Sequence, residues 1–296
     1  MTPTLAVDLP ALAAVLLAVI ACGTLGNWLV LRKEAMTGDA IAHAVLPGLV
    51  VGFLVSGSRS VLAMFIGAAI AGAAAVVSSS LLRTRARVDS GAALGIVLTA
   101  FFALGVLLLE TQGARQVDLD PECVLFGSVE TLFYAAPVSA PWYVGVPSEL
   151  WALAVAAVLA VASSFLCARQ FSALCFDAEY AHLANQSTRI AEQLLLVTVS
   201  VCVVASFFAV GSVLVIALLA CPALIAAPHA RSVRGQIVLS VLVACVIAVG
   251  AYFLAAYAPT VLGTRTALNA AGMIATLLAV AVPCSHLLRA VINRQG

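Results

Sequence analysis

Long apolar runs, each about as long as a membrane is thick, divide this chain, with short polar connections between them. Because the hydrocarbon core of a bilayer is about 30 Å thick, a transmembrane helix needs about 20 apolar residues. Only 9% of the residues are charged, whereas a soluble domain has about a quarter. The sequence therefore predicts an all-α, polytopic membrane helical bundle. The candidate spans are 10–31, 40–57, 60–82, 91–110, 150–168, 190–209, 211–227, 235–257 and 267–289.

The number of crossings depends on residues 190–227. Only Gly211 and its neighbours separate the sixth run from the seventh, so the chain has eight or nine spans. Lysine and arginine concentrate in cytoplasmic loops. Nine crossings place every basic cluster on one side, which predicts an outside N-terminus and a cytoplasmic C-terminus. The clusters are Arg32 with Lys33, Arg83 with Arg85 and Arg87, Arg231 with Arg234, and Arg289 with Arg294.

Nothing in the sequence marks off a separate soluble domain, so we expect residues 1–296 to form one transmembrane domain. The first run lacks a preceding basic segment and is interpreted as a retained span, not a cleaved signal peptide. The longest polar stretch, 111–149, would face outward. The eight cysteines form no C-x-x-C pair and are expected to pack as small apolar side chains. A net charge of +1 gives no reason to expect nucleic-acid binding.

Motifs for hydrolytic chemistry are missing from the sequence. There is no G-x-x-x-x-G-K-[ST] phosphate-binding loop, and Lys33 is the only lysine. Neither G-x-S-x-G nor H-E-x-x-H occurs. We therefore expect the chain not to be an enzyme, and we expect no permanently bound cofactor.

The segment from Gly38 to Gly48 carries an acid, Asp39, and an imidazole, His43, at the entrance to an apolar run. The i, i+4 spacing places both side chains on one helix face. Carboxylate oxygen and imidazole nitrogen suit first-row divalent metals, and ionisable groups within a membrane segment mark an ion or substrate pathway. Pro47 and Gly48 are expected to kink the helix and expose carbonyl groups to a cavity. The alternative is a helix N-cap at Asp39 followed by a buried, hydrogen-bonded histidine.

A second feature is Phe176-Asp177-Ala178-Glu179-Tyr180-Ala181-His182-Leu183-Ala184, in the predicted cytoplasmic loop before the sixth run. Apolar residues at 176, 180 and 183 fit one face of a short amphipathic helix. Such a helix could dock on a partner protein or lie on the membrane surface, and the pattern favours neither.

A third feature is the run 210–223, in which Pro222 would bend the chain. Small residues at 211, 212, 217, 220 and 223 predict close helix packing.

Together these segments resemble the permease subunit of ABC-type manganese/zinc/iron importers, over nearly the whole chain. Single pieces are unspecific, but their order and spacing identify the family. The matching segments are Arg32-Lys33, Gly38-Asp39-Ala40, His43-Ala44, Leu46-Pro47-Gly48, Gly95-Ile96-Val97-Leu98-Thr99, Val117-Asp118-Leu119-Asp120, Leu125-Phe126-Gly127, Phe176-Asp177-Ala178-Glu179, Val210 to Val215, Ala217-Leu218-Leu219 and Pro222-Ala223.

The resemblance implies an ATP-driven importer of Mn²⁺, Zn²⁺ or Fe²⁺ in the bacterial inner membrane. Two permeases, identical or different, would enclose the path, and Asp39 and His43 would line it. ATP-binding cassette subunits would dock at Phe176, Asp177, Glu179 and Tyr180 and hydrolyse the ATP. An extracytoplasmic binding protein would deliver the metal.

The chain departs from the family at two places, where Cys221 precedes Pro222 and where His229 follows Pro228. A thiolate would favour softer ions such as Zn²⁺, but a packing role fits Cys221 better, and His229 is expected at the membrane edge. The sequence leaves the preferred metal open.

Two other classes remain open at this stage. In a proton- or sodium-coupled secondary transporter, Asp39 and His43 would form a proton relay. In a membrane scaffold without transport activity, changing Asp39 would not affect metal uptake.

Overall fold

The computed structural model describes residues 5–57, 61–111, 147–176, 188–262 and 268–295. Over these ranges all the regular structure is α-helical, which confirms the predicted fold class. The polar stretch around residues 112–146 and the motifs within it lie outside the described residues. The helices are α1 (Leu5–Leu31), α2 (Met36–Ser56), α3 (Val61–Arg85), α4 (Ser90–Thr111), α6 (Ser148–Leu166), α7 (Ala168–Phe176), α9 (Thr188–Val210), α10 (Ser212–Ala226), α11 (Val233–Leu262) and α12 (Ala270–Gln295).

Eight of these helices are long and apolar enough to cross a membrane, and α10 is a shorter apolar helix. Its 15 residues span about 22 Å. The break before it is at Gly211, whose φ of 81° is a conformation that glycine adopts without steric cost. Of the nine predicted spans, eight therefore correspond to helices of membrane-spanning length in the described residues, and the seventh, 211–227, corresponds to the shorter helix α10.

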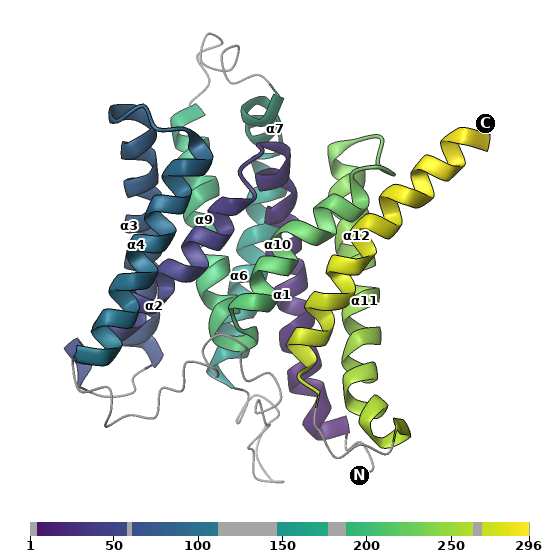
Figure 1. Ribbon diagram of the computed structural model, residues 1–296, viewed down its shortest axis with the longest axis horizontal. Helices are drawn as coiled ribbons and strands as arrows, with labels where there is room; N and C mark the ends of the chain where they lie inside the picture. Colours follow the sequence, from purple (N-terminus) through teal and green to yellow (C-terminus); the bar gives the residue numbers. More distant parts are fainter. Residues whose placement is uncertain (1–4, 58–60, 112–146, 177–187, 263–267, 296) are drawn as a thin grey trace.

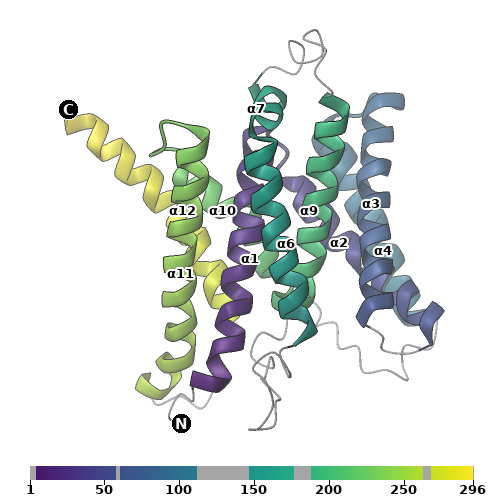
Figure 2. The same ribbon diagram turned by 180° about the vertical axis from the view of Figure 1, so that it is seen from behind.

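The helices run alternately up and down, and the chain begins on one side of the bundle and ends on the other (Figures 1 and 2). α10 takes the chain from the lower end of α9 back toward the upper side, where α11 starts (Figure 1). Consequently the ends of α1, α3 and α12 and the start of α11, which carry the basic clusters, lie on the upper side. This arrangement agrees with the predicted topology, so we take the upper side as the cytoplasmic side.

The centre of the bundle is formed by α1, α2, α9 and α10. The share of buried residues is 67% in the spans of α1 and α9 but 22% in those of α3 and α4. Large apolar side chains on the peripheral helices are exposed, among them Ile70, Leu107, Val158, Val246 and Leu287. In water such a surface would be unstable, whereas in a bilayer it contacts lipid or a partner helix.

Glycine residues allow α1 to pack closely against α10, and α2 to pack closely against α3. A methyl group added at Gly26 of α1 would lie 2.8 Å from the carbonyl carbon of Leu219 on α10, so these two helices approach closely. Of the small residues predicted to pack in the run 210–223, those at 211, 212 and 223 are buried and those at 217 and 220 are partly buried. Pro47 and Gly48 are buried rather than open to a cavity. A methyl group at Gly48 would lie 2.6 Å from Cβ of Ala71 on α3. The expectation that this part of the helix faces a cavity was wrong, because α3 crosses α2 at this glycine, and the kink at Pro47 stays a prediction.

This crossing gives a direct test. Gly48→Val should force α2 and α3 apart and lower the free energy of unfolding by about 1–3 kcal/mol, the usual cost of overpacking. Gly95→Val is the matched control, since a methyl group at Gly95 would meet no atom within 4 Å. Thermal unfolding of the detergent-solubilised protein measures both. Equal melting temperatures for the two variants would contradict the packing.

Candidate functional site

Asp39 and His43 lie together on α2. His43 Nε2 is 3.3 Å from Asp39 Oδ1, and both side chains are about a quarter exposed, at 24% and 25%. The helix begins at Met36 with Ala35 at its N-cap position, so Asp39 lies inside the first turns and is not the cap. The alternative in which Asp39 is the N-cap is therefore wrong. α2 starts four residues before the apolar run that begins at residue 40, because the polar turn before that run is also helical. His43 is likewise not fully buried.

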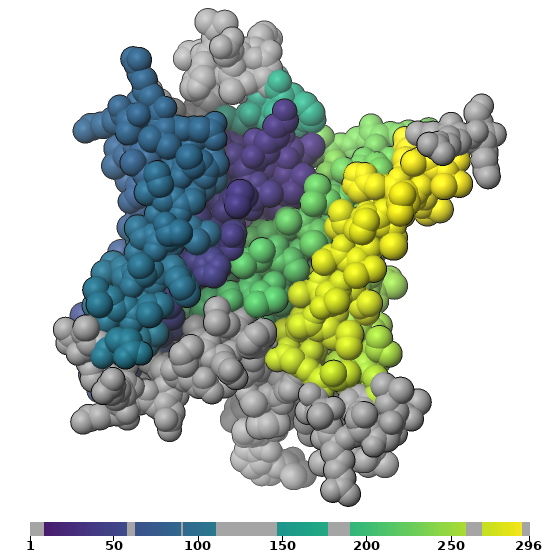
Figure 3. All heavy atoms as spheres, viewed as in Figure 1, coloured from purple at the N-terminus to yellow at the C-terminus, as the bar shows by residue number. Residues whose placement is uncertain are grey.

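Contacts on either side of the pair define the direction in which it faces. The ring of His43 packs edge-on against Phe102 of α4, with centroids 5.4 Å apart. One residue before Asp39, Gly38 lies against the side chain of Leu219 on α10. The pair thus occupies the part of α2 between α4 and α10. Figure 3 shows that the face between α4 and α12 is hollowed, with α10 and the first two helices at its floor.

Two donor groups do not complete the coordination shell of a divalent metal, which takes four to six ligands. Across the described ranges no group of three or more His, Cys, Asp or Glu side chains gathers where one ion could be held. Cys221 is partly buried on α10, and His229 lies in the turn after it, at intermediate exposure. An ion at Asp39 and His43 would need further ligands beyond the carboxylates, imidazoles and thiols of the described residues.

Of the residues expected to contact a partner ATPase, the structure describes Phe176. It is the last residue of α7 and is 68% exposed. Asp177, Glu179 and Tyr180 lie outside the described residues. The nine-residue helix α7, which the sequence analysis did not identify, is docked on the end of α1. Its Phe171 is buried against Trp28, with ring centroids 5.4 Å apart in an edge-on arrangement.

A charged cluster on the cytoplasmic side escaped the sequence analysis. Arg32 donates from Nε to Glu34 Oε2 at 3.0 Å and from Nη2 to Glu192 Oε1 at 2.7 Å, and Arg83 Nη1 donates to Glu34 Oε1 at 2.9 Å. The side chains of Arg32 and Glu34 are only 9% exposed. Burial lowers the pKa of Arg32, but the carboxylates of Glu34 and Glu192 outweigh it and raise this pKa above its usual range.

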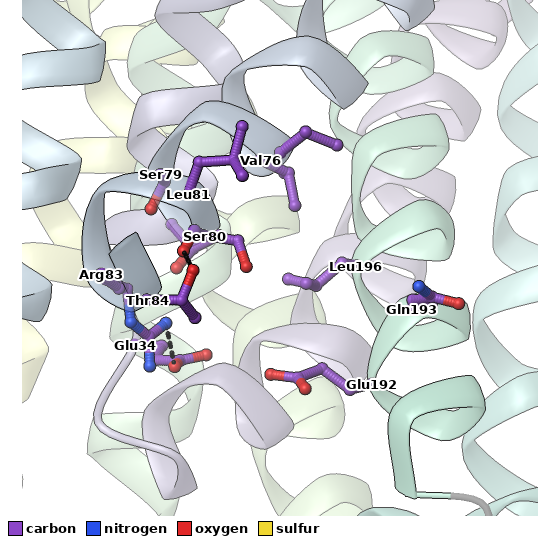
Figure 4. A pocket seen from close by; sticks show the side chains of 12 residues that line it. Glu34, Val76, Ser79, Ser80, Leu81, Arg83, Thr84, Glu192, Gln193 and Leu196 are labelled. Carbon is purple, nitrogen blue, oxygen red and sulfur yellow. Dashed lines mark hydrogen bonds and ion pairs between the residues drawn. The ribbon is translucent and has the colours of Figure 1, made fainter. Parts of the chain in front are cut away.

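Beside this cluster is a cavity of about 460 Å³ between the cytoplasmic ends of α3 and α9. Figure 4 shows Glu34 joined to Arg83 on one side of it and Glu192 and Gln193 on the other. Thr37 of α2 also lines the cavity. Since Thr37 and Asp39 are two residues apart on a helix, they point to nearly opposite faces. The cavity is therefore separate from the Asp39–His43 pair.

Comparison with known proteins gives the family of the chain. Residues 6–282 match the family described as "ABC 3 transport family". The chain belongs to this family. This ABC 3 transport protein is accordingly a multi-pass membrane subunit of an ABC-type transporter, as the resemblance implied.

Relatives of this ABC 3 protein include membrane components of metal transport systems. It is 38% identical over 240 residues to the manganese transport system membrane protein MntD of Bacillus subtilis, covering 80% of each chain. It is 33% identical to the zinc transport system membrane protein TroD of Treponema pallidum, covering 69% of this chain and 54% of TroD. A chain of the solved structure "PsaBC from Streptococcus pneumoniae in complex with Fab" has the same fold, with a TM-score of 0.75, 24% identity, and 94% and 90% of the two chains covered.

The docking of α7 on α1 can be tested through Cys175, whose Sγ lies 3.8 Å from the carbonyl oxygen of Trp28. Burial raises the pKa of the Cys175 thiol to about 11, so only a small thiolate fraction reacts at neutral pH. Two single-cysteine variants are compared: one keeps only Cys175, and the other lacks all native cysteines and carries Phe176→Cys. At pH 7.5, maleimide should label Cys175 at least about tenfold more slowly than the cysteine at position 176. Equal rates would show that α7 is not docked.

Proposed function

We propose that this chain is the membrane subunit of an ATP-driven importer of Mn²⁺, Zn²⁺ or Fe²⁺ in a bacterial inner membrane. The observation that supports this most directly is the partly exposed Asp39–His43 pair on an otherwise apolar helix, at 3.3 Å. An ionisable pair is costly in a membrane unless it lines a path or cavity. The names of the relatives, which include manganese and zinc transport systems, favour metal as the cargo.

A dimeric path follows from the number of ligands. One chain offers a carboxylate and an imidazole, and two chains facing each other across the hollow between α4 and α12 would offer four donor groups. Such a set of oxygen and nitrogen ligands suits Mn²⁺, Fe²⁺ and Zn²⁺ alike, and a path must bind its ion weakly enough to release it. The second permease can be a copy of this chain or a related one, and residues 1–296 would form one transmembrane domain.

The energy source would be a separate ATP-binding cassette subunit, because this chain has no phosphate-binding loop. Phe176 at the exposed end of α7, followed by Asp177, Glu179 and Tyr180, would form the docking segment on the cytoplasmic side. An extracytoplasmic metal-binding protein would deliver the ion to the opposite side. The chain itself would hold no permanent cofactor.

Uptake of ⁵⁴Mn²⁺ and ⁶⁵Zn²⁺ into proteoliposomes containing the whole transporter tests the metal path. Asp39→Asn and His43→Ala should each reduce ATP-dependent uptake by at least about tenfold, since the first replaces a charged carboxylate ligand with a weaker neutral amide and the second removes the imidazole. His286→Ala is the matched control, because it removes an exposed histidine of α12. Co-purification of the ATPase subunit with each variant verifies assembly.

Either of two results would contradict this function. Unchanged uptake in assembled Asp39→Asn and His43→Ala transporters would remove the pair from the path. Uptake by the permease alone, driven by a pH gradient without ATP, would favour the secondary transporter.

A further inference from the structure

The end of α1 is tied to both helices that flank residues 177–187. On one side, Trp28 packs on Phe171 of α7 and donates from Nε1 to Ser164 Oγ of α6 at 3.1 Å. On the other side, Arg32 forms its 2.7 Å ion pair with Glu192, in the second turn of α9. Movement of either α7 or α9 would therefore displace the end of α1.

The connection from α1 to α2 is short and has little freedom. α1 ends at Leu31 and α2 begins at Met36. Lys33 has a φ of 59°, a left-handed conformation that is unfavourable for a residue other than glycine. The amide of Glu34 donates to the carbonyl oxygen of Leu29 at 2.8 Å, and the amide of Thr37 donates to the carbonyl oxygen of Glu34 at 2.9 Å. Glu34 is thus fixed to the last turn of one helix and the first turn of the next.

We propose that Arg32 and Glu192 are positioning residues that transmit movement at the cytoplasmic end of α9, through Glu34, to the start of α2 and hence to Asp39. This inference rests on the proposed function, because it assigns the ion pairs to the coupling between ATP hydrolysis and the metal path. Asp39 follows Glu34 by five residues, and Asp39 and Thr37 belong to one continuous helix. A shift of Glu34 therefore displaces the Asp39 carboxylate with it.

Burial of Arg32 and Glu34 strengthens the ion pair between them, whereas their further partners Glu192 and Arg83 are 40% and 39% exposed. Because the side chains of Arg32 and Glu34 are only 9% exposed, salt and water screen their attraction much less than at the surface. Arg83 adds a third helix, α3, to the same carboxylate. Removing one partner leaves a buried charge uncompensated, so the helices have an energetic reason to move together.

Arg32 also has a hydrogen-bond donor without a partner among the described residues. Its Nη1 atom is buried, and no described residue accepts a hydrogen bond from it. Buried polar groups are usually hydrogen-bonded, and Asn27 Oδ1 and Gln236 Nε2 are the other buried side-chain atoms without a partner among the described residues. The Nη1 donor of Arg32 allows the guanidinium group to take another acceptor when α9 moves relative to α1.

The test uses the assembled transporter in proteoliposomes, with ATP hydrolysis and ⁵⁴Mn²⁺ uptake measured on the same sample. Glu192→Leu should lower the uptake per ATP hydrolysed by at least fivefold while the ATPase rate stays within twofold of the unaltered transporter. Glu192→Gln keeps a hydrogen-bond acceptor for Arg32, so its uptake per ATP should lie between that of Glu192→Leu and that of the unaltered transporter. Gln193→Leu is the matched control, since Gln193 lines the same cavity but is not a member of the ion-pair chain.

Two results would overturn the inference: an unchanged uptake per ATP in Glu192→Leu, which includes a parallel fall of hydrolysis and uptake, or an equal loss in Gln193→Leu. If Glu192→Leu does not assemble, an unchanged ratio in Glu192→Gln overturns it as well. Equilibrium binding of ⁶⁵Zn²⁺ to the transporter should be kept in Glu192→Leu and lost in Asp39→Asn. If Asp39→Asn keeps both Zn²⁺ binding and metal uptake, the proposed function fails. If Asp39→Asn loses them but the Glu192 variants keep the uptake per ATP of the unaltered transporter, this inference alone fails.

Discussion

Hydrogen bonding of the backbone in a layer without water is the constraint on which this structure depends. Each unpaired N–H or C=O group in hydrocarbon costs several kcal/mol, so the chain must satisfy these groups within its own helices. The eight long apolar helices meet this requirement. The same constraint explains why irregular chain, such as the break at Gly211, is buried between helices instead of facing lipid.

Association of the helices then depends on fit, because lipid is as apolar as the helix surfaces and provides no hydrophobic driving force. Glycine at positions 26 and 48 lets backbones approach to distances at which a methyl group would clash. A few polar contacts join helices that are distant in sequence, such as Asn27 Nδ2 donating to Ser240 Oγ at 2.7 Å between α1 and α11. Fit and sparse polar contacts together hold α1, α2 and α10 at the centre, where they form the floor of the hollow face.

Polar groups are divided between two opposite faces of α2. The face of Asp39 and His43 turns toward α4 and α10, and the face of Thr37 turns toward α3, α9 and the cavity beside the charged cluster. One helix therefore carries the candidate metal ligands and the contacts to the cytoplasmic ends of its neighbours. A rotation or shift of α2 would change the surroundings of both faces at once.

The sequence by itself determined those features that depend on local periodicity and composition. Apolar runs located the helices of membrane-spanning length, arginines marked helix ends that lie on one side of the bundle, and the i, i+4 spacing brought Asp39 next to His43, because one helical turn fixes that distance. Only the tertiary structure decided what lies across from each helix. Glu192 meets Arg32 across 160 positions, Phe102 meets His43, and α3 occupies the place beside Gly48 where a cavity was expected. Such contacts depend on how helices pack against one another, and no pattern within a single helix specifies its neighbour.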